Sequence, residues 1–151
     1  MKGKDIFKQL LPGVIVGLIL GFGLTMLVGV NKTDPIPNYI GGGVCCLVPT
    51  LLNCVIVLKG TAKHLKRELS VGDAVKRTIP YALLALVFGL FVVVVVVEKI
   101  LGVDPRTISV VNTAIYEAIL GVVVSTVSAF VALKSYEKQV KYTKRASKAK
   151  K

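Results

Sequence analysis

The chain has 151 residues, a net charge of +12 and 54% hydrophobic residues, whereas soluble globular domains are about 45–50% apolar. Its mean hydropathy of +0.72 argues against an ordinary soluble fold. The three cysteines all lie between residues 45 and 54, inside an apolar run, and so do not form a disulfide framework.

Four apolar runs follow one another along the chain, and each is about as long as the roughly 20 residues that a helix needs to cross a bilayer. Lipid offers no partner to backbone amides, so segments of this length with little two-residue alternation should be helices. The sequence therefore predicts an all-α, polytopic membrane protein with four transmembrane helices, at residues 13–30, 39–58, 80–101 and 110–133.

The first and third runs are preceded by the same pattern. Asp-x-x-Lys-x-x-x-Pro occurs at residues 5–12 and again at 73–80, and both runs then end at a Gly-Val and an Asp-Pro. This self-similarity predicts two parallel, tandem-repeated helical hairpins. The predicted units are residues 1–60, residues 61–135 with a linker at 61–79, and a basic tail at 136–151, with short interfacial helices at 3–11 and 70–79 before the odd-numbered spans.

The basic residues gather on one side of these spans. Segments 1–12, 59–79 and 134–151 hold three, six and eight of them, whereas the rest of the chain holds three. Because basic loops stay inside, both termini and the linker are predicted to be cytoplasmic in a multi-pass protein of the cell membrane. The two copies would then be related by a pseudo-twofold axis along the membrane normal.

Small residues recur at every fourth position of the first span. This spacing lets two helices approach closely in a bilayer, and we expect the partner to be another span of the same chain, with a second copy of the protein as the alternative. We call the set the glycine stripe: Gly13, Gly17, Gly21, Thr25 and Gly29.

Polar side chains collect on one face of each even-numbered span. Pro49 removes the helical partner of the Cys45 carbonyl. That carbonyl lies beside polar side chains of the second span, and a matching set lies on the fourth. These polar stripes are a candidate permeation path, formed by Cys45, Thr50, Asn53, Thr113, Glu117, Ser125 and Ser128.

Glu117 is the ionisable residue placed well inside a span. A carboxylate at membrane depth is costly and usually faces a partner or a water-filled space, which makes it a functional candidate. If the fourth helix begins late, however, Glu117 lies among the outer headgroups. The sequence leaves both positions open.

The tail carries basic residues at short intervals. It either binds anionic lipid headgroups, where each basic side chain contributes about 1 kcal/mol, or only determines topology. Nucleic acid is not an expected partner, because no aromatic platform accompanies the lysines. The residues assigned to headgroups are Lys138, Lys141, Lys144, Arg145 and Lys148.

No hydrolase, metalloprotease or phosphate-loop motif occurs, nor does a His and carboxylate cluster suited to a metal, so we expect neither an enzyme nor a cofactor. The first functional hypothesis is conduction or transport of a small ion or solute along the polar stripes. The alternative is a structural or assembly subunit that docks by helix packing and its basic tail. A homo-oligomer or a larger membrane complex is compatible with both.

Overall fold

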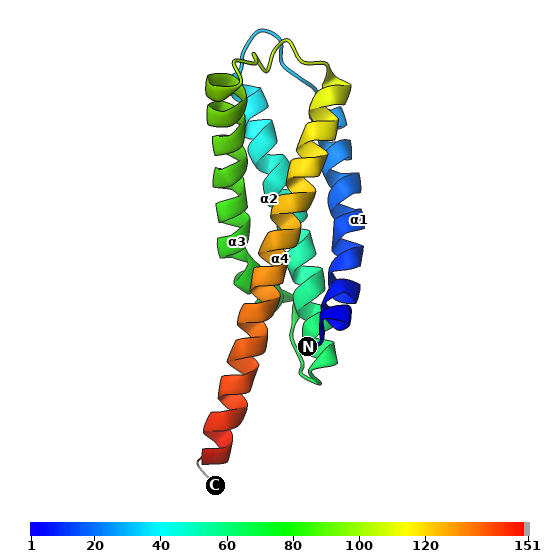
Figure 1. Ribbon diagram of the computed structural model, residues 1–151, viewed down its shortest axis with the longest axis vertical. Coiled ribbons are helices and arrows are strands. Elements are labelled where there is room, and N and C mark those ends of the chain that lie inside the picture. Colours follow the sequence, from blue (N-terminus) through cyan, green and yellow to red (C-terminus); the bar gives the residue numbers. More distant parts are fainter. Residues whose placement is uncertain (150–151) are drawn as a thin grey trace.

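The computed structural model describes residues 1–149, and its regular elements over this range are helices. Figure 1 shows an elongated bundle with the N- and C-termini at the same end, which we call the termini end. In chain order the elements are α1 (Gly3–Val28), α2 (Ile36–His64), α3 (Val71–Phe91), the π-helix η1 (Val92–Ile100) and α4 (Val110–Ala149).

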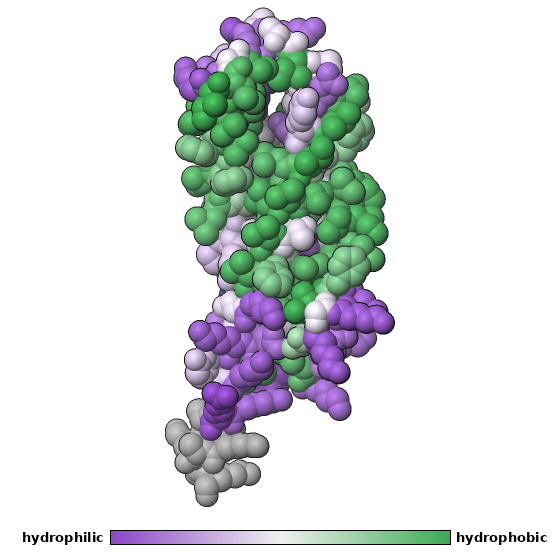
Figure 2. Space-filling model, viewed as in Figure 1, coloured by the Kyte–Doolittle hydropathy of each residue, from purple (hydrophilic) through white to green (hydrophobic). Residues whose placement is uncertain are grey.

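Four helices are long and apolar enough to cross a membrane, with η1 continuing α3. In Figure 2 an apolar band covers the middle of the molecule, and polar residues cover both ends. The prediction of an all-α chain with four membrane-length helices is therefore confirmed, and the structure fits a multi-pass membrane protein.

The helix α2 is the centre of the bundle. It packs against α1, α3 and α4, and α4 also packs closely against α1. The outer helices α1 and α3 do not touch each other within the described chain and lie on opposite sides of the pair α2 and α4 (Figure 1). The seam between α3 and α4 is the most loosely packed of the helix pairs that touch along the bundle, so it is where a groove can open.

The tightest apolar core lies toward the termini end, between α2 and α4. Val57 and Leu58 of α2 and Leu133 of α4 have at most 1% of their surface exposed. Tyr136 joins the same cluster one turn further along α4. Close packing of these side chains adds van der Waals contact between α2 and α4, so this cluster anchors α4 to α2.

The two proline-marked helix starts differ from the expectation of separate interfacial helices. Pro12 and Pro80 lie inside continuous helices α1 and α3. Ser70 caps the start of α3, because its hydroxyl accepts the backbone N–H of Asp73 at 3.0 Å. A proline removes one helical hydrogen bond, whereas breaking the helix would expose several more, so the helix continues.

Two further departures concern helix ends. The tail beyond residue 135 is not a separate segment, because α4 runs unbroken to Ala149; residues 122–149 contain neither glycine nor proline to stop it. The third span ends in π geometry, in which the Leu101 N–H bonds the Val96 carbonyl. This stretch begins with six consecutive valines, whose branched side chains crowd the preceding turn of an α-helix.

Candidate functional site

Glu117 lies where α1, α2 and α4 meet. Its Oε2 accepts a hydrogen bond of 2.6 Å from the hydroxyl of Thr25, and the same hydroxyl lies 3.3 Å from the Cys45 sulfur. The Gly21 carbonyl oxygen in the same helix lies 2.9 Å from the Thr25 hydroxyl and is a second acceptor for its single proton. The carboxylate therefore points into the bundle toward two neighbouring helices.

Two glycines make room for the Glu117 carboxylate. A Cβ added to Gly42 would lie 3.5 Å from Glu117 Oε1, and one added to Gly21 would lie 2.9 Å from the Cα of Ala118. The glycine in α1 brings α4 close enough for Thr25 to reach Glu117. Gly42 in α2 has no side chain, and this leaves space next to Oε1 of Glu117.

The carbonyl released by Pro49 faces α4. A Cβ added to Gly121 would lie 2.9 Å from the Cys45 carbonyl oxygen, so α2 and α4 meet there through backbone atoms. This contact lies one turn along α4 from Glu117. The carbonyl is therefore part of the same buried polar region as the carboxylate.

A second polar level lies further toward the termini end, about 12 Å along α4 from Glu117 at 1.5 Å per residue. Asn53 Nδ2 donates to Ser125 Oγ at 3.3 Å, and a Cβ on Gly13 would overlap the Asn53 side chain. Asn53 Oδ1 and Thr50 Oγ1 are buried without a protein hydrogen-bond partner. Buried polar atoms normally have a partner, so this level can accept a small polar species.

These two levels form what we call the polar column: Thr25, Cys45 and Glu117 at one level, and Thr50, Asn53 and Ser125 at the other. Glu117 is half-buried, as are the remaining residues of the predicted polar stripes, whereas the other five members of the column are buried. These residues are Thr113 and Ser128, and the Thr113 hydroxyl donates to the carbonyl of Ser109, which directly precedes α4.

The glycine stripe faces inward over most of its length. Gly13, Gly17, Gly21 and Thr25 are buried, with Gly17 next to Val122 and Ser125 of α4. Gly29 instead caps α1 with φ +71° and is half-exposed. The sequence analysis assigned Thr25 to packing alone and missed its bond to Glu117. A hydroxyl among four glycines was the signal for that role.

The predicted headgroup residues lie on the last turns of α4. Lys138, Lys141, Lys144 and Arg145 are exposed, whereas the side chain of Lys148 lies outside the described residues. Lys141 pairs at 3.3 Å with Glu137, which also holds Lys134 at 3.6 Å. The basic surface therefore begins directly beyond the apolar core.

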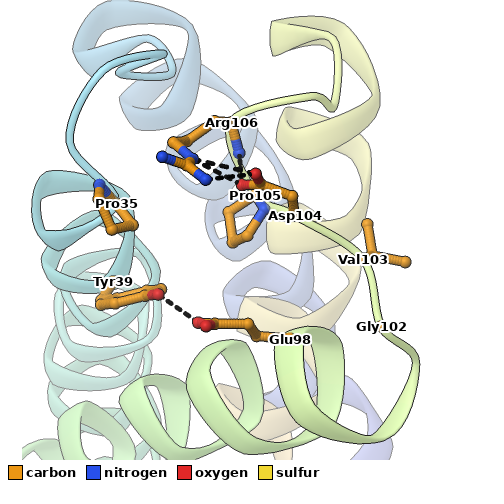
Figure 3. Close-up of a pocket in the computed structure, with 8 residues that line it drawn as sticks. All are labelled: Pro35, Tyr39, Glu98, Gly102, Val103, Asp104, Pro105 and Arg106. Atoms are coloured by element: carbon orange, nitrogen blue, oxygen red, sulfur yellow. Dashed lines mark hydrogen bonds and ion pairs between the residues drawn. The ribbon is translucent and has the colours of Figure 1, made fainter.

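A polar pocket of about 240 Å³ opens at the end opposite the termini (Figure 3). It lies between the start of α2, the end of η1 and the following loop. Tyr39 donates a hydrogen bond to Glu98, and Asp104 pairs with Arg106 at 2.7 Å. Tyr39 lies about one helical turn before Gly42 in α2, so this pocket lies on the Glu117 side of the polar column, away from the termini end.

The loop carboxylate in this pocket is held ionised. Hydrogen bonds from the Arg106 guanidinium and backbone lower the pKa of Asp104, and the same carboxylate raises the pKa of Arg106. The pair is exposed, so it orders the loop and does not form a buried ionic centre. The pocket wall carries both signs of charge.

Within the described residues, no group of three or more His, Cys, Asp or Glu side chains is arranged to hold a metal. No protein-family model matches the chain, and no curated protein or solved structure matches it either.

Proposed function

We propose that this chain is a non-enzymatic integral membrane protein that passes a proton or a small cation along the polar column. The observation that carries the proposal is the Glu117 carboxylate, which is oriented by Thr25 at the junction of three membrane-length helices. A carboxylate at such a position binds and releases a positive charge, and its neighbours determine which form is favoured.

The second level supports the same function. Asn53 Oδ1 and Thr50 Oγ1 offer acceptor atoms that no protein donor occupies, and Ser125 adds a hydroxyl beside them. Hydroxyl and amide oxygens are suited to a hydrated small cation or to a short chain of water. The path would enter through the pocket at Tyr39 and Glu98 and leave toward the termini end.

The proposal includes an ancestral duplication with both termini in the cytoplasm. Pro12 and Pro80 are 68 positions apart, as are Gly21 and Gly89. Lys59 and Lys134 are 75 apart, as are Gly43 and Ala118. The contact of Gly21 with Ala118 and that of Gly89 with Gly43 are therefore matched pairs.

The geometry of these matched pairs supports the duplication. A Cβ on Gly21 would lie 2.9 Å from the Cα of Ala118, and a Cβ on Gly89 would lie 3.1 Å from the Cα of Gly43. Two helix crossings with the same residue spacing and similar closeness are what a pseudo-twofold relation produces.

The same spacings match the pair Thr25 and Glu117 to the pair Val93 and Gly42. A Cβ on Gly42 would lie 2.6 Å from Val93 Cγ2, so this second pair is also a contact. The first copy thus contributes the Thr25 hydroxyl and Gly42, and the second copy contributes the apolar side chain of Val93 and the carboxylate of Glu117. A single charge-binding group would serve the whole bundle.

Reconstitution into liposomes tests this function. We expect the purified wild-type chain to dissipate a proton or sodium gradient, as followed by an entrapped indicator, and Glu117→Gln to abolish the flux. Glu68→Gln is the matched control, because it removes an exposed carboxylate from the loop between α2 and α3 and should leave the flux unchanged. Equal flux from wild type and Glu117→Gln would overturn the proposal.

Water access gives an independent test. In a background where Cys45, Cys46 and Cys54 are replaced by alanine, Ser125→Cys should react with a small charged thiol reagent added to the liposomes. Val127→Cys, two residues along α4 on the exposed apolar surface, is the control that lipid should protect. Protection of both positions would mean that the column is dry.

A dry column would favour the second candidate function, a structural or assembly subunit. The observation behind it is α4, which extends well past the other helices at the termini end (Figure 1). That projecting segment exposes Lys138, Lys141 and Arg145, together with Tyr142. A basic helix of this kind would dock on anionic headgroups or on an acidic partner, and copurification of a constant partner would identify this role.

A further inference from the structure

A groove of about 220 Å³ lies between α3 and α4 at the termini end. Its floor includes the buried side chain of Leu58 from α2. Its walls are largely apolar and include Pro80 of α3 and Ala132 of α4. The polar groups in the walls come from Arg77 and Tyr81 of α3 and from Ser135, Tyr136 and Gln139 of α4. These residues are spaced by three or four positions in each helix, so each helix presents one continuous face to the groove.

Arg77 is held in place within this groove. Its Nη1 donates to Gln139 Oε1 at 2.6 Å, and its guanidinium carbon lies 5.5 Å from the centre of the Tyr136 ring. With the cation over the aromatic ring, the remaining N–H groups of Arg77 can donate to a further acceptor in the plane of the guanidinium. The arginine is thus preoriented for an acceptor with two oxygens.

The groove is positively charged. Its lining contains no Asp or Glu, and Glu137, next to Tyr136 in sequence, is already paired with Lys134, Lys141 and the Met1 amine. Hydroxyl groups of Ser135 and two tyrosines add neutral donors. An arginine among hydroxyl donors with no opposing carboxylate selects a phosphate.

The matching groove in the first copy is closed. By the spacings of 68 and 75, Gln9 matches Arg77 and Gly60 matches Ser135. A Cβ on Gly60 would lie 2.0 Å from Gln9 Oε1, so α1 and α2 touch where α3 and α4 stand apart. Ser135 replaces the glycine that permits close approach, and the groove in the second copy is open.

The depth of the groove favours a membrane ligand. Lys76 and Arg77 on α3 mark where the polar end of the molecule begins. On the membrane side of Arg77, α3 exposes Leu83, Leu84 and Val87, of which Leu84 is 68% exposed. A ligand with its phosphate at Arg77 could therefore lay an apolar chain along α3.

We propose that this groove binds the phosphate of one anionic phospholipid, with Arg77 as the principal contact and Ser135 and the tyrosine hydroxyls as further donors. Basic pockets between membrane helices near one bilayer surface are suited to such headgroups. The site requires only that the four helices span a bilayer, so it does not depend on transport through the polar column.

Native mass spectrometry of the full chain, released from nanodiscs of phosphatidylcholine containing one phosphatidylglycerol in five, tests the site. We expect one phosphatidylglycerol retained per chain and about tenfold weaker retention in Arg77→Gln, the loss expected for a charge-assisted hydrogen bond. Lys76→Gln removes the same charge one residue away and should retain the lipid as wild type does.

A second variant separates the site from folding and net charge. Ser135→Phe keeps every charge and fills the groove, so it should lose the bound lipid while its helical circular dichroism matches that of wild type. Equal loss in Lys76→Gln and Arg77→Gln would overturn the proposal in favour of diffuse charge. Equal retention of phosphatidylcholine, or displacement by soluble inorganic phosphate at the same concentration as the lipid, would also overturn it.

Discussion

The hydroxyl of Thr25 donates to the carboxylate of Glu117 across 92 positions of sequence, and this bond joins the first helix to the last. Both side chains come from apolar helices, and the bond forms where glycines bring the helices close. Its strength can be tested apart from any transport measurement.

Thr25→Val removes the donor while keeping the shape of the side chain. We expect the unfolding free energy in detergent to fall by about 1–3 kcal/mol, because a half-buried carboxylate loses its hydrogen-bond donor. Equilibrium titration with sodium dodecyl sulfate measures this change in unfolding free energy. Thr143→Val is the control. Like Thr25, Thr143 has a hydroxyl that bonds the carbonyl four residues earlier, but its side chain is exposed. This substitution should change the unfolding free energy by no more than about 0.5 kcal/mol.

Gly21→Ala should destabilise the bundle by about 1–3 kcal/mol, because the added methyl meets the backbone of α4 and the helices must move apart. Gly23→Ala is a matched control in the same helix. A Cβ there meets nothing within 4 Å, so this variant should be neutral or stabilised by up to about 1 kcal/mol. The same unfolding titration distinguishes the two, and equal effects would contradict the close contact.

The proposed duplication makes its own prediction at the matched crossing. Gly89→Ala adds a methyl group 3.1 Å from the Gly43 Cα and 2.8 Å from the Gly42 carbonyl oxygen. We expect it to destabilise the chain by about as much as Gly21→Ala, roughly 1–3 kcal/mol. If Gly89→Ala left the unfolding free energy unchanged while Gly21→Ala lowered it, the two helix crossings would not be equivalent.

The loop pair gives a prediction for pH. Because Arg106 lowers the pKa of Asp104, the carboxylate stabilises the loop above its unfolded pKa, and this contribution is lost as the pH falls through the lower folded value. Carbon-detected NMR titration of Asp104 should show ionisation below 3.8, its ordinary value. Arg106→Gln should return the midpoint toward that value, and an unchanged midpoint would exclude the guanidinium as the cause.

The prediction of the four helices from sequence succeeded because it rests on a local property. A bilayer-length apolar run has to satisfy its backbone internally, whichever neighbours it finds. The glycine stripe was equally visible, since its spacing of four is set by the helix itself. The separate interfacial helices predicted at 3–11 and 70–79 are instead continuous with the spans that follow, because losing one hydrogen bond at Pro12 or Pro80 is less costly than ending the helix.

The partners within the candidate site required the tertiary structure. Glu117 and the Cys45 carbonyl were predicted as candidates from the sequence. The contact of Thr25 with Glu117 and that of Gly121 with the Cys45 carbonyl were not, because those distances depend on how closely α1, α2 and α4 cross. The groove at Arg77 was likewise absent from the sequence analysis. It arises from a gap between two helices, and no single residue in the sequence indicates such a gap.

The sequence by itself thus determined that the chain forms four apolar helices with most of its basic residues on one side, since hydropathy and charge act on each segment separately. Only the tertiary structure decided that the carboxylate of Glu117 meets Thr25 and that α3 stands off from α4 at Ser135. Those outcomes depend on contacts between segments far apart in the chain, where the presence or absence of one side chain sets the distance between two helices.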